Sequence, residues 1–148
     1  MGAVIVLDPV EAGQSAAALR GIDVALGRGA ERVLLVPGDC PALDPSEVSA
    51  LLAHDAGVVI VPDRHGEGTN ALLLAPPDVM EPAFGEGSFA RHSARARAAG
   101  ADLQVAEVRS LGLDIDTPDD LAALRRALGA WPGGAARTRA LLEEAAVA

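Results

Sequence analysis

Short aliphatic runs alternate along the chain with longer segments in which apolar residues recur at helical spacing. The runs are predicted to be strands, and they cover residues 3–8, 32–39, 57–63, 70–77 and 102–108. The segments with helical spacing cover 13–29, 44–54, 88–100 and the stretch after 117. Because the strand runs are continuously apolar, we expect both faces of the sheet to be buried. This alternation predicts an α/β fold with a mostly parallel sheet flanked by helices.

Local signals mark two helix starts and one break. Each start is an N-cap residue followed by Pro at the first helical position, namely Asp44 with Pro45 and Thr117 with Pro118. The two aspartates after Pro118 add negative charge to the positive first turn of that helix. Residues 129–135 are the only segment with linker character. We therefore expect one domain over residues 1–130 and a C-terminal helical tail over residues 131–148.

Composition narrows the functional classes. The chain has 148 residues, 50% of them hydrophobic but only 2% aromatic, so its core must be aliphatic. Its net charge is −9, and all 12 basic residues are Arg, which argues against a nucleic-acid partner or an anionic membrane. A single Cys excludes an internal disulfide and a cysteine zinc cluster. With no long apolar run and no leader-like start, we expect a soluble cytoplasmic protein.

The stretch "LGLDIDTPDDL", residues 111–121, is unusually acidic. Helix capping accounts for the last two aspartates, which leaves Asp114 and Asp116 unexplained. In an extended segment these two point to the same face, where their carboxylates repel unless they are solvated, protonated or sharing a cation. A solvated acidic turn is the commoner case for such a stretch alone. A site for Mg²⁺ or a similar hard cation is the alternative.

Asp39 strengthens the metal hypothesis. It follows a predicted strand in "LLVPGDCPALDP", and Gly38 beside it allows close backbone approach. An Asp that only caps a turn is an equally good explanation of this residue alone. Ligands in α/β sheets bind at the carboxyl ends of strands, where Asp39, Asp114 and Asp116 are all expected. Three carboxylates there could hold divalent cations, with phosphate oxygens filling the remaining positions.

The loop "FGEGSFARH" is a candidate anion site. Gly85 and Gly87 free its backbone N–H groups to turn towards an anion, and Ser88 is predicted as the N-cap of the next helix. Arg91 and His92 in the first turn could reach the same anion, although such residues are more often solvated surface. An ordinary loop with a Ser cap explains the pattern equally well.

Four segments in order carry a family resemblance. They are "LLVPGDCPAL", "GEGTNALLL", "FGEGSFARHSARARAAG" and "LDIDTPDDL", between residues 34 and 121. Together they resemble the guanylyltransferases of deazaflavin coenzyme F-420 biosynthesis, which act on phosphoenolpyruvate or 2-phospho-L-lactate. The resemblance implies a nucleotidyltransferase fold of the nucleotide-diphospho-sugar transferase type. It also implies transfer of GMP from GTP to a three-carbon phosphorylated acid, with release of pyrophosphate.

The resemblance also implies roles for individual residues. Asp39, Asp114 and Asp116 would be the catalytic, Mg²⁺-binding residues. Thr69 of "GEGT", with Gly85 and Ser88, would hold the phosphorylated acid. The segment "EAGQSAAALRGI" matches the stretch of the family near the nucleotide, so its Gly13 and Ser15 are candidates for nucleotide binding.

The chain departs from the family at its start. The family's first strand and Lys-containing phosphate loop have no counterpart, since the chain contains no Lys, so we expect an N-terminally incomplete fold. An exposed sheet edge should result, covered by a partner chain, as in a homodimer, or by residues 131–148. Two alternatives stay open: a related nucleotidyltransferase with a molybdopterin or sugar-phosphate acceptor, and a non-catalytic module that binds a phosphometabolite or another protein.

Overall fold

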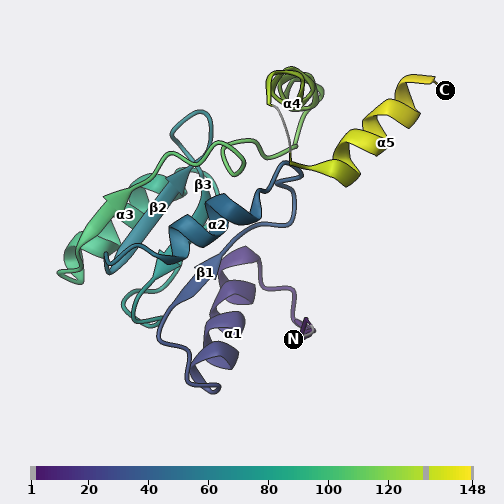
Figure 1. Cartoon of the computed structure of the whole chain (residues 1–148). Helices are drawn as coiled ribbons and strands as arrows, with labels where there is room; N and C mark the ends of the chain where they lie inside the picture. The colour runs from purple at the N-terminus through teal and green to yellow at the C-terminus, as the bar shows by residue number, and fades with distance from the viewer. Residues whose placement is uncertain (1–2, 132–133, 148) are drawn as a thin grey trace.

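The protein is built around one four-stranded sheet. The computed structural model describes residues 3–131 and 134–147. The strands lie in the order β1, β3, β2, β4 across the sheet (Figure 1). Their bounds are Val33–Leu35 for β1, Val58–Pro62 for β2, Thr69–Leu74 for β3 and Leu103–Val105 for β4. Four of the five predicted strands are therefore confirmed, with shorter bounds at β1 and β4.

The sheet is mixed, which corrects the prediction of a mostly parallel one. Strand β2 pairs in parallel with β4, whereas β3 pairs antiparallel with both β1 and β2. The reason is the short connection between Pro62 and Thr69, because a parallel crossover needs about a dozen residues or more. Three strands consequently run one way and β3 runs the other. The carboxyl ends of β1, β2 and β4 and the amino end of β3 therefore lie at the same end of the sheet.

Five helices complete the described part of the chain. Their bounds are Gln14–Leu26 for α1, Pro45–Leu52 for α2, Ser88–Ala98 for α3, Pro118–Ala130 for α4 and Ala136–Val147 for α5. The starts of α2 and α4 are as predicted: Asp44 accepts a hydrogen bond from Ser46 N–H, and Thr117 forms a capping box with Asp120. The start of α3 differs by one residue. Gly87, with φ of 68°, is the N-cap, and Ser88 is the first helical residue without a side-chain cap bond.

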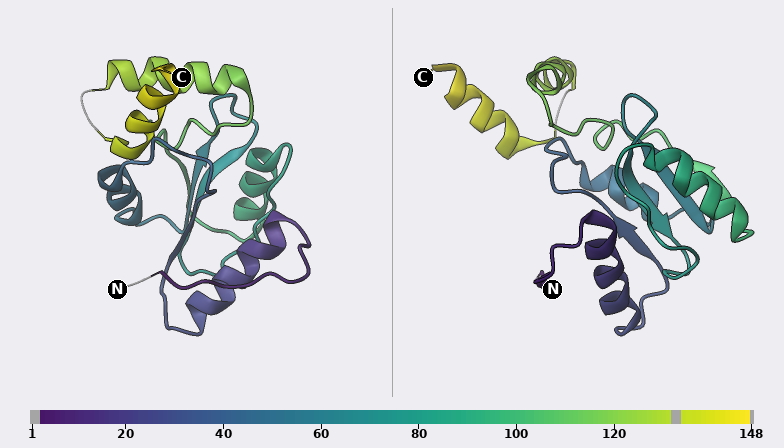
Figure 2. Two further views of the ribbon diagram at one scale, coloured as in Figure 1. Left: turned by 90° about the vertical axis from the view of Figure 1, so that its right-hand side faces the viewer. Right: turned by 180° about the vertical axis from the view of Figure 1, so that it is seen from behind.

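Both faces of the sheet are buried, as expected. Along β2, Val59 and Val61 pack on one face with Leu51 of α2. Val58 and Ile60 pack on the other face, in the cluster that contains residues of α1 and α3. Figure 2 shows this layering in its left view, with α2 on one side of the edge-on sheet and α1 and α3 on the other. Successive apolar side chains of β2 point to opposite faces of the sheet, so one strand contributes to a hydrophobic cluster on each face.

The predicted strand over residues 3–8 is wrong. These residues form no strand, and Val4, Ile5 and Leu7 are 54%, 84% and 79% exposed. A strand exists only where its N–H and C=O groups pair with a neighbour, and no strand of the described chain lies against this segment. Its described anchor is an ion pair of 3.1 Å between Asp8 and Arg20 of α1.

One long edge of the sheet has no cover from the tail. Within the described residues, β1 pairs only with β3, so its other edge is free of strand partners. Helix α5 lies near α4 and away from β1 (Figure 1). Leu142 and Trp131 pack in the cluster of Leu124 and Leu128 of α4. The expectation that residues 131–148 cover the sheet edge is therefore wrong for the described part of this tail.

The predicted domain boundary and the predicted absence of a membrane span remain to be considered. Residues 132–133, inside the predicted linker, lie outside the described residues, and the division of the chain after residue 130 stays a prediction. Among the helices that the structure describes, none combines the length and apolar character that crossing a bilayer requires.

Candidate functional site

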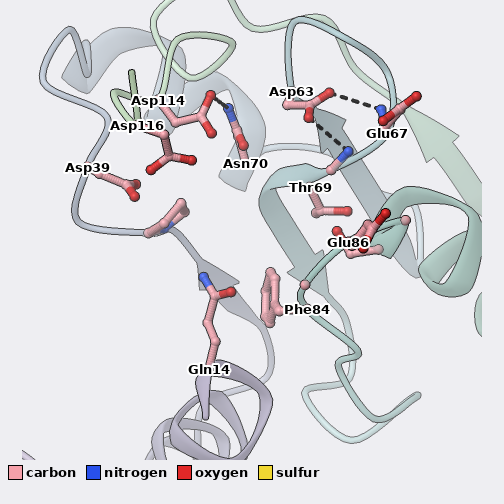
Figure 3. Close-up of a pocket in the computed structure, with 15 residues that line it drawn as sticks. Gln14, Asp39, Asp63, Glu67, Thr69, Asn70, Phe84, Glu86, Asp114 and Asp116 are labelled. Atoms are coloured by element: carbon pink, nitrogen blue, oxygen red, sulfur yellow. Dashed lines mark hydrogen bonds between the residues drawn. The ribbon is translucent and has the colours of Figure 1, made fainter. Parts of the chain in front are cut away.

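A polar cavity of about 340 Å³ opens at the end of the sheet where β1, β2 and β4 terminate and β3 begins. Residues far apart in the sequence line it, because the loops after β1 and β4 meet the start of β3 and the loop before α3 (Figure 3). Its lining residues are Gln14, Pro37, Asp39, Asp63, Glu67, Gly68, Thr69, Asn70, Phe84, Gly85, Glu86, Gly87, Ser88, Asp114 and Asp116. We call it the strand-end pocket.

The structure places Asp39, Asp114 and Asp116 in this one pocket. Figure 3 shows them gathered on one side of it, opposite Thr69. Two contacts join their loops: Ile115 N–H donates to the Asp39 carbonyl at 3.2 Å, and Asn70 Nδ2 donates to Asp114 Oδ1 at 3.2 Å. The loops that carry the aspartates are thus fixed to each other and to β3.

The donor set suits a hard cation in kind, since carboxylate oxygens are what Mg²⁺ prefers. Six carboxylates line the strand-end pocket, and none of its described lining residues is Arg. However, no three His, Cys, Asp or Glu side chains of the described residues lie close enough to form a ready metal cluster. Any cation would therefore complete its coordination with ligand oxygens or water, as Mg²⁺ usually does.

Asp63 shapes the turn that leads into Thr69. Its carboxylate accepts hydrogen bonds from the N–H groups of His65 at 3.0 Å, Glu67 at 3.0 Å and Gly68 at 2.9 Å. Burial alone would raise the pKa of Asp63, but these N–H groups bring it below its usual 3.8. The approach is so close at Gly68 that an added Cβ would lie 2.7 Å from Asp63 Oδ2. Only glycine fits this position without a shift.

Arg91 holds the Gly-rich loop from within α3. Its guanidinium donates to the carbonyls of Ala83 and Phe84 at 3.2 Å each, and to that of Glu86. Three of its five N–H groups are thus used on the loop, and Arg91 is not among the described residues that line the strand-end pocket, so contact between Arg91 and an anion stays a prediction. The loop's own N–H groups remain. In the described chain those of Gly85, Glu86 and Gly87 have no hydrogen-bond partner, and all three residues line the pocket.

His92 is buried, not at the solvated surface that its position in a first helical turn suggested. Its side chain is 0% exposed, with Nδ1 2.9 Å from Thr69 Oγ1 and Nε2 2.8 Å from Ala83 N. Burial, with Arg91 and Arg95 adding positive charge nearby, lowers the pKa of His92 to about 4. The imidazole is thus neutral at neutral pH.

The candidate nucleotide residues lie at the margin of the pocket. Gly13 is the N-cap of α1, with φ of 96°, and Ser15 Oγ accepts a hydrogen bond from Phe84 N–H at 2.8 Å. Neither lines the strand-end pocket, whereas Gln14 between them does. Ser15 ties α1 to the Gly-rich loop. Ser88 does line the pocket, and its side chain is almost fully buried.

Sequence reasoning missed several lining residues, among them Gln14, Asp63, Asn70 and Glu86. The sequence offered a signal for Gln14, Asn70 and Glu86, because each is adjacent to a candidate site residue. Asp63 had a different signal, since an Asp that opens a Gly-rich turn commonly accepts from the turn's own N–H groups.

Cys40, next to Asp39, has no nucleophile character. Its thiol is 5% exposed, and burial together with the negative charges of Asp39 and Asp114 raises its pKa to about 12. Cys40 instead packs as a small buried residue in the core cluster that contains Leu51 and Val59.

Comparisons with known proteins match the same region. The sequence model of the family described as "Guanylyl transferase CofC like" matches residues 16–126. A phosphoenolpyruvate guanylyltransferase of Conexibacter woesei is 54% identical over 141 residues, which are 93% of this chain and 63% of that protein. One of Sphaerobacter thermophilus is 47% identical over 125 residues, 83% of this chain and 60% of that protein.

A 2-phospho-L-lactate guanylyltransferase of Methanothermobacter thermautotrophicus is 40% identical over 96 residues, covering 64% of this chain and 42% of that protein. The chain thus spans about three fifths of the length of its more similar curated relatives, at 63% and 60%. The family match covers the strand-end pocket except Gln14, and it extends over most of the chain. The chain therefore belongs to the guanylyl transferase CofC-like family.

Proposed function

We propose that this chain takes part in guanylyl transfer, in which GMP passes from GTP to phosphoenolpyruvate or 2-phospho-L-lactate and pyrophosphate is released. The relatives' names supply the substrates, and the coenzyme F-420 pathway follows from the family. The observation that carries the proposal is the strand-end pocket. It combines free N–H groups suited to a phosphate with carboxylates suited to a cation.

In the proposed reaction, a phosphate oxygen of the three-carbon acid attacks the α-phosphorus of GTP. A new P–O bond forms as the bond from the α-phosphorus to the bridging oxygen breaks, and that oxygen leaves with pyrophosphate. Because the nucleophile is already an anion, no general base is required. The protein's task is to position two anions and offset their repulsion.

The residues divide this task between two sides of the pocket. Gly85 and its neighbours offer N–H groups to the phosphate of the acid, and the hydroxyls of Thr69 and Ser88 add donors. Asp39, Asp114 and Asp116 are the residues that would hold Mg²⁺, which supplies charge neutralisation for the phosphate oxygens when bound. Gln14, with Gly13 and Ser15 around it, would border the nucleotide.

Further features of the whole protein are part of the proposal. Family membership supports a nucleotidyltransferase fold, of which the four-stranded sheet described here would be a portion. Family membership and the single, buried Cys support a cytoplasmic location. The uncovered edge of β1 and the exposed apolar residues before α1 support a further strand there, from a homodimer partner or other chain.

A non-catalytic binding module is the second candidate, and one observation favours it. None of the described residues lining the strand-end pocket carries a positive charge, yet GTP brings about four negative charges near neutral pH. Such a pocket fits a small phosphorylated acid with Mg²⁺ better than it fits a triphosphate.

Calorimetry with phosphoenolpyruvate tests both candidates, because both require Mg²⁺-dependent binding. We expect clear binding with Mg²⁺ and at least about tenfold weaker binding without it, since the ligand would then face six carboxylates unscreened. Asp114→Asn should reduce the dependence on Mg²⁺. Asp55→Asn is the matched control, because Asp55 is exposed and outside the pocket. Equal affinity with and without Mg²⁺ would contradict the proposal.

A further inference from the structure

The hydrogen-bond contacts of His92 determine which of its two ring nitrogens carries a hydrogen. The Nε2 atom of His92 is 2.8 Å from Ala83 N. A backbone N–H can only donate, so Nε2 must accept and cannot itself carry a proton. In a neutral imidazole the one N–H is then at Nδ1.

Thr69 is fixed as an acceptor by the same argument. Nδ1–H of His92 faces Thr69 Oγ1 at 2.9 Å, so the Thr69 oxygen accepts this hydrogen bond. The hydroxyl keeps its own hydrogen, which must donate elsewhere. In the described chain no other side chain or carbonyl takes it, and Thr69 lines the strand-end pocket.

We propose that His92 is a positioning residue: by donating to Thr69 Oγ1 it leaves the Thr69 hydroxyl hydrogen to donate into the strand-end pocket, to an anionic oxygen of the phosphorylated acid. This inference rests on the proposed function for the identity of the ligand. It adds a residue that touches no ligand, and it assigns a direction to a hydroxyl that could otherwise face either way.

The surroundings of His92 fix its ring. The side chain is fully buried, and the Phe84 ring packs against it edge to face, with centroids 5.0 Å apart and planes at 76°. Burial and the nearby Arg91 and Arg95 keep the imidazole neutral, as its lowered pKa shows. Protonation would put a second N–H against Ala83 N–H, donor against donor, so the neutral form belongs to this arrangement.

The ring also joins the two parts of the proposed acid site. One nitrogen contacts Thr69 at the start of β3, and the other contacts Ala83, two residues before Gly85 of the Gly-rich loop. Arg91, the residue before His92 in α3, donates hydrogen bonds to the carbonyls of Ala83, Phe84 and Glu86. A single buried side chain thus contacts both the Thr69 hydroxyl and the residue that precedes the Gly-rich loop.

Nitrogen NMR of the unaltered chain tests the hydrogen-bond pattern without any ligand. We expect His92 near pH 7 to show a protonated Nδ1 and an unprotonated Nε2 in the ¹⁵N shifts of the ring. A ring protonated at Nε2, or at both nitrogens, would overturn the inference.

A double-mutant cycle tests the donor role, with phosphoenolpyruvate and Mg²⁺ as the probe in calorimetry. Thr69→Val removes the hydroxyl at nearly constant shape, and we expect about 10- to 100-fold weaker binding. His92→Gln keeps an acceptor for Ala83 N–H but no fixed donor to Thr69, and it should weaken binding by about fivefold or more. In the Thr69→Val background, His92→Gln should have no further effect.

His92→Asn supplies the rescue. Its amide N–H takes the place of Nδ1–H, so it should bind phosphoenolpyruvate more tightly than His92→Gln does. Additive effects of Thr69→Val and His92→Gln, or equal affinities of the Gln and Asn variants, would overturn the positioning role. If the unaltered chain bound no phosphoenolpyruvate, the proposed ligand and the donor role would fail together. The nitrogen shifts would still show whether the Thr69 and His92 pattern exists.

Discussion

Individual charged residues in and beside the strand-end pocket bind mostly to backbone groups. Asp63 gathers three N–H groups of its turn, and Arg91 gathers three carbonyls of the Gly-rich loop. These two charged side chains find their hydrogen-bond partners within the loops. In the described chain the N–H groups of Gly85, Glu86 and Gly87 are not used in this way and can bind a ligand. Buried polar groups without partners are costly, so such loops hold one shape.

His92 should make the protein less stable as the pH falls from about 6.5 to about 4. The pKa of this imidazole is 6.5 in the unfolded chain and about 4 in the fold. In that window the unfolded chain binds a proton that the folded chain does not, so acid favours unfolding. We expect a loss of order 1–3 kcal/mol in the free energy of unfolding, measured by denaturant titration at several pH values.

The carboxylates provide an internal control for this prediction. Asp44, Asp63 and Asp120 have pKa values below 3.8, so the stability they contribute is lost only at more acidic pH. His92→Gln should flatten the curve between pH 6.5 and 4 and leave the more acidic part unchanged. A free energy of unfolding that is constant across this window in the unaltered chain would contradict the assignment.

At the scale of elements, α4 and the acidic loop before it form one unit. The Asp120 carboxylate accepts from the N–H groups of Asp116 at 3.2 Å and Thr117 at 2.7 Å, and from the Thr117 hydroxyl at 2.7 Å. Arg64 of the β2–β3 turn pairs with its other oxygen at 2.6 Å. Through this ion pair, Asp120 joins the turn before Thr69 to the loop that carries Asp114.

Asp120→Ala should destabilise the fold and loosen the acidic loop. We expect a loss of about 1–2 kcal/mol in the free energy of unfolding, the usual cost of a lost cap bond. Phosphoenolpyruvate binding in Mg²⁺ should weaken as well, because Asp116 loses the partner of its backbone N–H. Asp119→Ala is the matched control, since Asp119 lies in the same first turn and is exposed. Equal thermal stability of the two variants would show that the capping box contributes little.

At the scale of the whole molecule, the balance of charge limits what the described chain can bind. Among the residues that the structure describes, six carboxylates and no Arg line the strand-end pocket. The chain also spans only 63% and 60% of the length of two relatives named phosphoenolpyruvate guanylyltransferase.

We therefore expect this chain alone to turn over GTP poorly or not at all, even where it binds phosphoenolpyruvate with Mg²⁺. Transfer from a triphosphate usually needs Lys or Arg against the phosphates in addition to metal. A pyrophosphate-release assay with GTP, phosphoenolpyruvate and Mg²⁺ measures this, with the full-length relative of Conexibacter woesei as the positive control. Robust release by the 148-residue chain would contradict the prediction.

The amino-acid sequence by itself determined the elements with strong local signals. The helix starts at Asp44 and Thr117 follow from side chains that satisfy their own turn, and β2 and β3 follow from long aliphatic runs. Family motifs pointed to residues that the structure places in one pocket, although their roles stay predictions. Such features depend on neighbours in sequence, which is why sequence shows them.

Only the tertiary structure decided what depends on distant partners. The apolar run at residues 3–8 has strand character, but within the described chain no neighbouring strand pairs with it. The N-cap of α3 is Gly87 and not the predicted Ser88, and Arg91 holds the loop before this cap through the Glu86 carbonyl. His92 lies in a first helical turn, where sequence predicts a solvated side chain, yet it is buried between Thr69 and Ala83. Burial and hydrogen-bond direction arise from contacts between remote segments, and no local pattern encodes them.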